Sequence, residues 1–317
     1  MKIYSALFLL AAVAVSAHHA PAAEPRINLV CSTYPIRLLT REVTAEVPSV
    51  KVDLLVPAET GCPHDYVLTP TDMRRLMRAD AVIVNGLGLD EFLNKPLMSV
   101  KPDAVIIDTS VGIDDLLPAR IPTVGQRHAH GHEDDETHAH HGDAHGDFNP
   151  HLFASPRHAA RLVMNIAAAL SEIDPEHAAS YDAAARNAAE RLRRLSQDMA
   201  LTATEFARRK IVTHHNVFDY LAQDLELDVV AVIQGGHGQE PTATELRRLI
   251  RVLREHKVAV LITEPQYRDN VVTVLSAETG VPLATLDPLA TGPEDADLDY
   301  YLTVMRANIE KLQRLLQ

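Results

Sequence analysis

The stretch 175-PEHAASYDAAARNAAERLRRLSQDMALTATEFARR-209 decides the fold of this 317-residue chain. It is rich in Ala, Arg, Glu and Leu and has no glycine and no proline after its first residue. This composition predicts one helix of roughly thirty residues, on the order of 45 Å long. Such a length exceeds what one α/β lobe needs, and no heptad repeat indicates a coiled coil. We therefore expect a strut that spans two lobes.

Apolar and helical runs alternate on both sides of this helix, a pattern typical of parallel sheets covered by helices. On the N-terminal side we expect strands at 27–32, 50–56, 81–84 and 104–107 and helices at 35–47, 71–79 and 156–173. On the C-terminal side we expect strands at 210–213, 229–233, 258–263 and 282–286 and helices at 217–225, 242–256, 269–279 and 297–316. The sequence predicts two doubly wound α/β lobes joined by one long rigid α-helix: an N-terminal lobe at 24–155, helices at 156–209 and a C-terminal lobe at 210–317.

The first 23 residues have the pattern of a secretory signal peptide. Lys2 precedes an apolar stretch that is too short to anchor a bilayer, and small residues place the cleavage between Ala17 and Ala23. No cysteine follows closely enough to accept a lipid, so we expect a periplasmic protein without a lipid anchor. The formal net charge of −13 argues against nucleic acid and anionic membranes as partners and favours cations.

Residues 127–147 form a tract rich in histidine and acidic residues. With so few apolar groups it cannot offset the entropy of ordering, so we expect a mobile loop. Imidazole binds zinc, copper and nickel, which makes the loop a candidate secondary metal site, with a merely solvated spacer as the alternative. Of the 17 histidines in the chain, the tract contains His128, His130, His132, His138, His140, His141 and His145.

Three further histidines and one aspartate lie where predicted strands end or helices begin: His64, His151, His215 and Asp287. Ligands of open α/β sheets bind beyond the carboxyl ends of strands, which puts two of these histidines and Asp287 at a site-forming edge. Their separations contain no local metal-binding signature, and any one histidine alone more often has a structural role. His214 precedes His215, so the register of the third position stays open by one residue.

Five short segments taken together resemble one family: 63–66 (PHDY), 149–153 (NPHLF), 215–220 (HNVFDY), 264–267 (EPQY) and 286–289 (LDPL). In this order they are similar to the solute-binding proteins of zinc- and manganese-type ABC importers, over almost the whole mature chain. The resemblance implies a monomeric protein that is not an enzyme and that holds one metal between its lobes. It implies the ligands His64, His151, His215 and Asp287, and delivery of the metal to the importer's membrane permease.

The resemblance also bears on which metal is bound. Three imidazoles and one carboxylate fit tetrahedral Zn²⁺, whereas manganese-binding members usually replace the third histidine by a carboxylate. Members often have Asp where this chain has Asn149, and some have a carboxylate where it has Pro63, which leaves Asp287 or water as the fourth donor. The alternatives are a manganese- or iron-binding member and, in a different class, a secreted zinc hydrolase. An adhesin is disfavoured because no lipid-acceptor cysteine is present.

Further expectations concern groups around this site. Cys31 lies at the end of the first predicted strand and Cys62 just beyond the second, so the two can form a disulfide that steadies the His64 loop, with two buried thiols as the alternative. Asp65 or Glu264 is expected to orient a ligand ring. His237, in a glycine-rich loop, either reaches the metal or belongs to a plain turn. We expect the histidine-rich loop to collect metal, to sense it or to dock a periplasmic zinc metallochaperone. Zinc affinity should fall as the pH drops through the imidazole range near 6.5.

Overall fold

The structure is a computed structural model that describes residues 27–60, 63, 66–119, 147–234, 241–267 and 270–317. Several predicted features lie outside these residues and stay predictions. They are the signal peptide at 1–23, the seven histidines of the 127–147 loop, His64, Asp65, Cys62 and His237.

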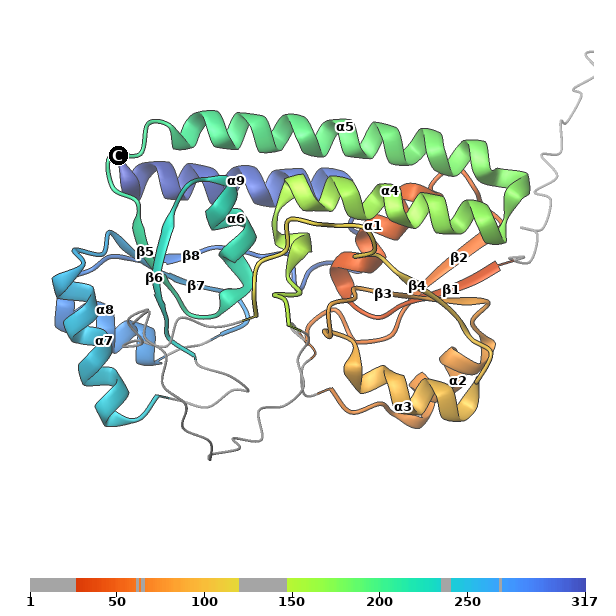
Figure 1. Ribbon diagram of the computed structural model, residues 1–317, viewed down its shortest axis with the longest axis horizontal. Helices are drawn as coiled ribbons and strands as arrows, with labels where there is room; N and C mark the ends of the chain where they lie inside the picture. Colours follow the sequence, from red (N-terminus) through yellow and green to blue (C-terminus); the bar gives the residue numbers. More distant parts are fainter. Residues whose placement is uncertain (1–26, 61–62, 64–65, 120–146, 235–240, 268–269) are drawn as a thin grey trace, which may run out of the picture.

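The first lobe contains a parallel sheet in the order β2-β1-β3-β4. Its strands are β1 (Ile27–Cys31), β2 (Val50–Leu54), β3 (Ala81–Val84) and β4 (Val105–Asp108), each within two residues of its predicted bounds. Helix α1 (Tyr34–Thr44) covers one face, and helices α2 (Pro70–Arg78) and α3 (Glu91–Val100) lie on the other (Figure 1). Helix α3 was not predicted, and Pro96, a residue type that usually interrupts helices, lies in its middle.

The second lobe repeats this plan with a parallel sheet in the order β6-β5-β7-β8. Its strands are β5 (Lys210–Thr213), β6 (Asp228–Val232), β7 (Val260–Thr263) and β8 (Leu283–Thr285). A 3₁₀ turn η3 (Asn216–Phe218) leads into α6 (Asp219–Asp224), and helices α7 (Ala243–Glu255), α8 (Asn270–Thr279) and α9 (Leu298–Leu316) follow. A capping box begins α7, since Thr242 and Glu245 each accept a bond from the other's backbone N–H.

Helix α5 (Ala178–Ala203) runs across both lobes, with α4 (Pro156–Ile173) beside it (Figure 1). It has 26 residues and is therefore about 39 Å long, shorter than the single helix predicted over 175–209. The segment before it, Pro175–His177, is a 3₁₀ turn. Beyond its end the chain is tied to α9 instead of continuing the helix, because the backbone N–H groups of Ala207 and Arg208 both donate to the carbonyl of Leu316.

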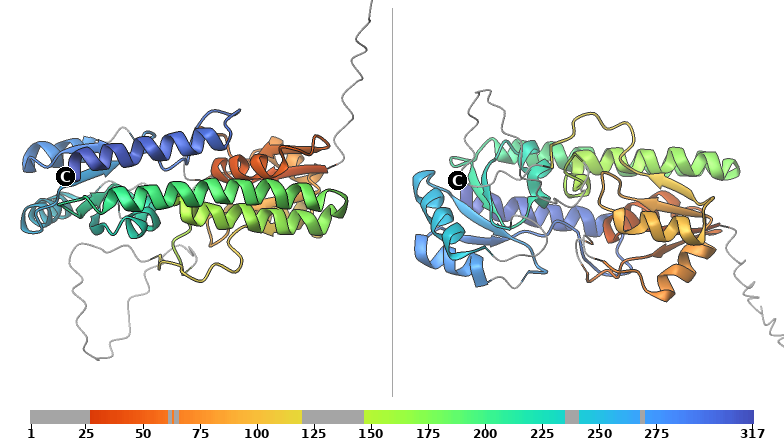
Figure 2. Two further views of the ribbon diagram at one scale, coloured as in Figure 1. Left: turned by 90° about the horizontal axis from the view of Figure 1, so that it is seen from above. Right: turned by 60° about the horizontal axis from the view of Figure 1, so that its bottom comes forward.

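One continuous hydrophobic core joins the lobes through α5. Small residues let the helices approach closely, since Ala185, Ala188 and Ala189 of α5 are all fully buried. Helices α1, α4, α5 and α9 lie together on one side of the two sheets (Figure 2). Successive side chains of a strand point to opposite faces of its sheet, so each sheet also has a smaller hydrophobic core on the face away from α5. In β1, for example, Leu29 faces the shared core, whereas Val30 faces α2 and α3. The predicted fold class, two lobes on a common strut, is confirmed.

A second connection between the lobes runs through the segment that precedes α9. The Arg41 guanidinium donates to the carbonyl oxygens of Glu294 and Ala296, at 2.9 and 3.1 Å. Gly292 lies so close to Tyr34 that a Cβ at this position would fall 2.2 Å from the tyrosine hydroxyl oxygen. These contacts join α1 of the first lobe to the segment that leads into α9.

The described residues also bear on membrane crossing and on the cysteines. None of the helices within the described residues combines the length and the hydrophobicity needed to cross a bilayer. Cys31 is buried, and burial raises the pKa of its thiol to about 12. Because Cys62 lies outside the described residues, its pairing with Cys31 stays a prediction.

Candidate metal centre

Two of the three predicted histidine ligands meet where the lobes join. The rings of His151 and His215 lie 4.9 Å apart between centroids and are nearly perpendicular, at 80°. His151 immediately precedes a 3₁₀ turn η1 (Leu152–Ala154) that leads into α4, and His215 lies between β5 and η3. His151 is buried and the His215 side chain is 15% exposed. The structure thus brings together imidazoles that are 64 positions apart in the sequence.

The two adjacent histidines of the second lobe have different surroundings. The ring of His214 packs on the ring of Tyr267, with centroids 4.6 Å apart, whereas His215 faces His151. Side chains at successive extended positions point to opposite sides of the backbone, which explains the difference. The geometry favours His215 over His214 as the partner of His151.

Glu264 is a buried carboxyl group beside His215, and the half-buried Asp287 is near enough to influence it. Glu264 follows β7, and its Oε1 lies 3.8 Å from Nδ1 of His215, while its Oε2 accepts a bond from Gln266 Nε2 at 2.6 Å. Burial, with a smaller contribution from the neighbouring Asp287, raises the pKa of Glu264 to about 8 against the lowering effect of the Gln266 bond. Burial also raises the pKa of Asp287, against the lowering effect of a bond from the Leu289 backbone N–H and of Lys311.

A bound cation would lower the raised pKa values of Glu264 and Asp287, because positive charge favours the ionised carboxylates. Within the described part of the chain, however, no three His, Cys, Asp or Glu side chains are gathered closely enough to hold a metal. His64, the third predicted imidazole, lies outside that part. The described residues therefore supply two imidazoles, with the carboxyl group of Glu264 beside them. Of the two groups predicted to orient a ligand ring, Asp65 and Glu264, it is Glu264 that lies beside His215 within the described residues.

We expect Glu264→Gln to stabilise the metal-free protein more at high pH than at low pH. The folded-state pKa of Glu264 lies above that of an unfolded glutamate, so stability is lost as the pH rises from about 4.5 toward about 8. Glutamine does not ionise and avoids this loss. The difference in unfolding free energy between variant and wild type should grow by at least about 1.4 kcal/mol between pH 5 and pH 8 in urea titrations. An unchanged difference would contradict the burial of an uncompensated acid here.

A pocket of about 370 Å³ opens beside Glu264. It is lined by the first-lobe residues Ala58 and Glu59 and by Pro265, Gln266, Thr291, Gly292 and Glu294 of the second lobe. Gln266, which bonds Glu264, links the pocket to this residue. The carboxylates of Glu59 and Glu294 make its lining attractive to cations.

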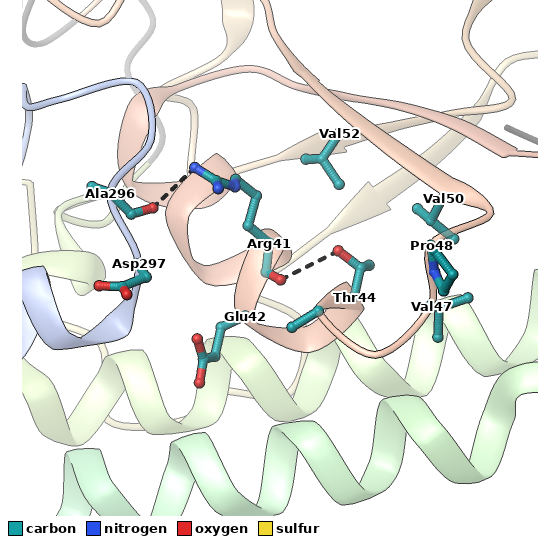
Figure 3. Close-up of a pocket in the computed structure, with 10 residues that line it drawn as sticks. Arg41, Glu42, Thr44, Val47, Pro48, Val50, Val52, Ala296 and Asp297 are labelled. Atoms are coloured by element: carbon teal, nitrogen blue, oxygen red, sulfur yellow. Dashed lines mark hydrogen bonds between the residues drawn. The ribbon is translucent and has the colours of Figure 1, made fainter. Parts of the chain in front are cut away.

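A second pocket, of about 380 Å³, lies between α1, β2 and the segment before α9 (Figure 3). Arg41 reaches across it to the carbonyl of Ala296, and Glu42 and Asp297 supply its carboxylates. None of the described residues that line it carries an imidazole or a thiol. We therefore assign this pocket to the contact between the lobes and not to metal binding.

Sequence reasoning missed Asn149, which holds the His151 ring. Its Oδ1 lies 2.8 Å from His151 Nδ1, and its Nδ2 donates to the carbonyl of Asn216 beside His215. The only available signal was its place two residues before His151, where the resemblance led us to expect Asp.

Two α/β lobes on a common helix, with imidazoles from both halves of the chain facing each other between them, define a bilobal binding protein with a candidate metal centre at the lobe junction. The family model described as zinc-uptake complex component A, periplasmic, matches residues 29–315, and the chain belongs to this family. The predicted family is confirmed, and it is a family of solute-binding proteins.

Individual relatives agree with this assignment. The zinc-binding protein AdcA of Streptococcus pyogenes is 29% identical over 300 residues, covering 92% of this chain and 56% of AdcA. The chain thus spans about half the length of that relative. A putative metal-binding protein of Treponema pallidum is 28% identical over 276 residues, covering 86% of this chain and 83% of its own. Among solved structures, the solute-binding protein FpvC of Pseudomonas aeruginosa in complex with Mn²⁺ is 26% identical, with a TM-score of 0.76 and coverage of 92% and 98%.

Proposed function

We propose that this protein captures Zn²⁺ between its lobes and delivers it to an ABC importer in the inner membrane. The observation that carries the proposal is the approach of His151 and His215 from the two halves of the chain, with their rings 4.9 Å apart. Membership of the zinc-uptake family and the zinc-binding name of the streptococcal relative support zinc as the cargo. No covalent chemistry on the metal is required of such a protein.

The proposed ligands are His64, His151, His215 and Asp287. Three neutral imidazoles and a carboxylate suit four-coordinate Zn²⁺, while Mn²⁺ favours more oxygen donors. The pKa of Asp287 is raised by burial, so a bound cation would also favour its ionised form. Glu264 is proposed to stand behind His215 and to compensate positive charge there.

The proposed setting is the periplasm, after cleavage of residues 1–23 and without a lipid anchor. The family description includes the periplasm, and the acidic net charge of −13 suits a carrier of cations. We further propose that the protein acts as a monomer. The histidine-rich loop is proposed to bind additional zinc weakly or to dock a metallochaperone.

The test is a zinc titration of the mature chain and of a variant in which residues 127–146 are deleted. The deletion should be tolerated, because the chain on either side of the loop is already paired: the Ala119 N–H donates to Asp147 O at 3.0 Å, and the Asn149 N–H to Leu117 O at 2.8 Å. We expect one tight zinc site in both proteins and fewer weak sites in the variant.

Competition with a fluorescent chelator separates the tight site from the weak ones. Loss of the tight site on deletion would show that the loop supplies the primary ligands. A wild-type chain that binds no zinc tightly, or that prefers Mn²⁺ at equal concentration, would contradict the proposed function.

A further inference from the structure

The side chain of Asn149 is fully buried at the junction of the lobes, and all of its polar atoms are bonded. Its Oδ1 accepts a bond from the His151 backbone N–H at 3.0 Å and lies 2.8 Å from His151 Nδ1. Its Nδ2 donates to the carbonyl of Asn216 at 2.9 Å and to Oδ2 of Asp219 at 3.0 Å. A single amide therefore joins the segment that carries His151 to the segment that carries His215.

These bonds determine the orientation of the Asn149 amide, that is, which of its two terminal atoms is the oxygen and which is the nitrogen. A backbone N–H can only donate, so the atom facing the N–H of His151 must be the amide oxygen. A backbone carbonyl can only accept, so the atom facing Asn216 O must be the NH₂ group. A flipped amide would put donor against donor and acceptor against acceptor at the same time.

The orientation of the amide determines the protonation of His151. Because an oxygen without a hydrogen faces Nδ1, the neutral ring must carry its proton on Nδ1 in order to donate to Asn149. The lone pair of the neutral ring then lies on Nε2, the nitrogen on the far side. A ring nitrogen must present a lone pair to bind a metal.

We propose that Asn149 is a positioning residue that selects the metal-binding tautomer of His151 and ties this ring to the His215 segment. The inference rests on the proposed function, since it names the group that prepares one of its ligands. It also gives a reason for an amide at this position. Aspartate could accept from His151 but could not donate to Asn216, and it would place a second carboxylate beside the half-buried Asp219.

The matched control is Tyr220→Phe, which removes a bond to the backbone of Asn149 instead of one to its side chain. The Tyr220 hydroxyl donates to the backbone carbonyl of Asn149 at 2.8 Å and accepts from the Leu117 N–H at 3.1 Å. Tyr220→Phe removes both bonds but leaves the Asn149 side chain in place. If Asn149 only stabilised this region, Tyr220→Phe and Asn149→Ala would change the zinc affinity alike. If Asn149 selects the tautomer of His151, only Asn149→Ala should change that tautomer.

The experiment compares the full mature chain with its Asn149→Ala, Asn149→Asp and Tyr220→Phe variants. Long-range ¹H–¹⁵N spectra of the metal-free proteins near pH 8 identify the tautomer of His151, and chelator competition gives the zinc affinity. We expect Nδ1–H in wild type, Asn149→Asp and Tyr220→Phe, and a shift toward Nε2–H in Asn149→Ala. Zinc should still bind one to one in Asn149→Ala, with affinity lower by about 10- to 100-fold, and within about threefold of wild type in Tyr220→Phe.

An Nε2–H tautomer of His151 in wild type, or an unchanged tautomer and affinity in Asn149→Ala, would overturn the inference. Should Asn149→Ala fail to fold, Asn149→Asp decides, because it keeps the acceptor for Nδ1 and loses both donors: Nε2–H in this variant would also overturn it. Wild type that binds no zinc would defeat the proposed function, yet the spectra of the metal-free protein would still decide the tautomer.

Discussion

Replacing His151 or His215 by alanine should lower the affinity for zinc more than about 100-fold, which corresponds to about 2.7 kcal/mol. Each ring is expected to be a direct ligand, and even partners that only orient a ligand typically contribute 10- to 100-fold. The two rings face each other at close range, so removing either one leaves a bound zinc ion with one ligand fewer. Chelator competition at neutral pH measures the change, and circular dichroism checks that the variants fold.

His214→Ala is the matched control for this experiment. It removes an adjacent, buried imidazole that packs on Tyr267 instead of facing His151. We expect its zinc affinity to stay within a few-fold of wild type, even if its thermal stability falls. A large loss in His214→Ala together with a small loss in His215→Ala would mean that the register of the third ligand is shifted by one residue.

Leu192→Ala should destabilise the whole protein by about 2–5 kcal/mol. Leu192 is fully buried in α5, the helix whose core side joins both lobes, and its truncation leaves a cavity among tightly packed neighbours. Because the core is continuous across the lobes, we expect one cooperative unfolding transition at lower denaturant concentration.

Leu201→Ala provides the comparison, since it makes the same substitution in the same helix at a position that is 70% exposed. Its unfolding free energy should stay within about 0.5 kcal/mol of wild type. Equal effects of the two substitutions, or separate transitions for two lobes in Leu192→Ala, would contradict the role of α5 as a shared strut.

Much of the fold could be predicted from local sequence signals. Strand β3 has the predicted bounds, as does β5, because apolar runs between polar segments indicate buried parallel strands. Helix α4 begins as predicted, with Ser155 accepting from the His158 N–H ahead of Pro156. Helix α3 was missed, since its packing against the first lobe outweighs the break that Pro96 signals. Helix α5 ends at Ala203, although the helix-favouring composition of the sequence continues to Arg209.

The candidate site was predictable only where a side chain lies at the end of a strand or the start of a helix. His215 was placed correctly beyond β5, and its approach to His151 followed from the resemblance. The contacts that organise the pair could not be read from the sequence, because they connect distant segments. Asn149 bonds Asp219, 70 positions away, and Tyr34 fits against Gly292 across the lobes.

X-ray absorption at the zinc K-edge tests the central claim most directly. The sample is the loop-deleted protein with one equivalent of zinc, compared with its His215→Ala variant. We expect a four-coordinate shell with imidazole scattering from three rings at about 2.0–2.1 Å, and one ring fewer in the variant. A zinc shell of water and carboxylate oxygens without imidazole, unchanged by His215→Ala, would contradict a metal site shared by the two lobes.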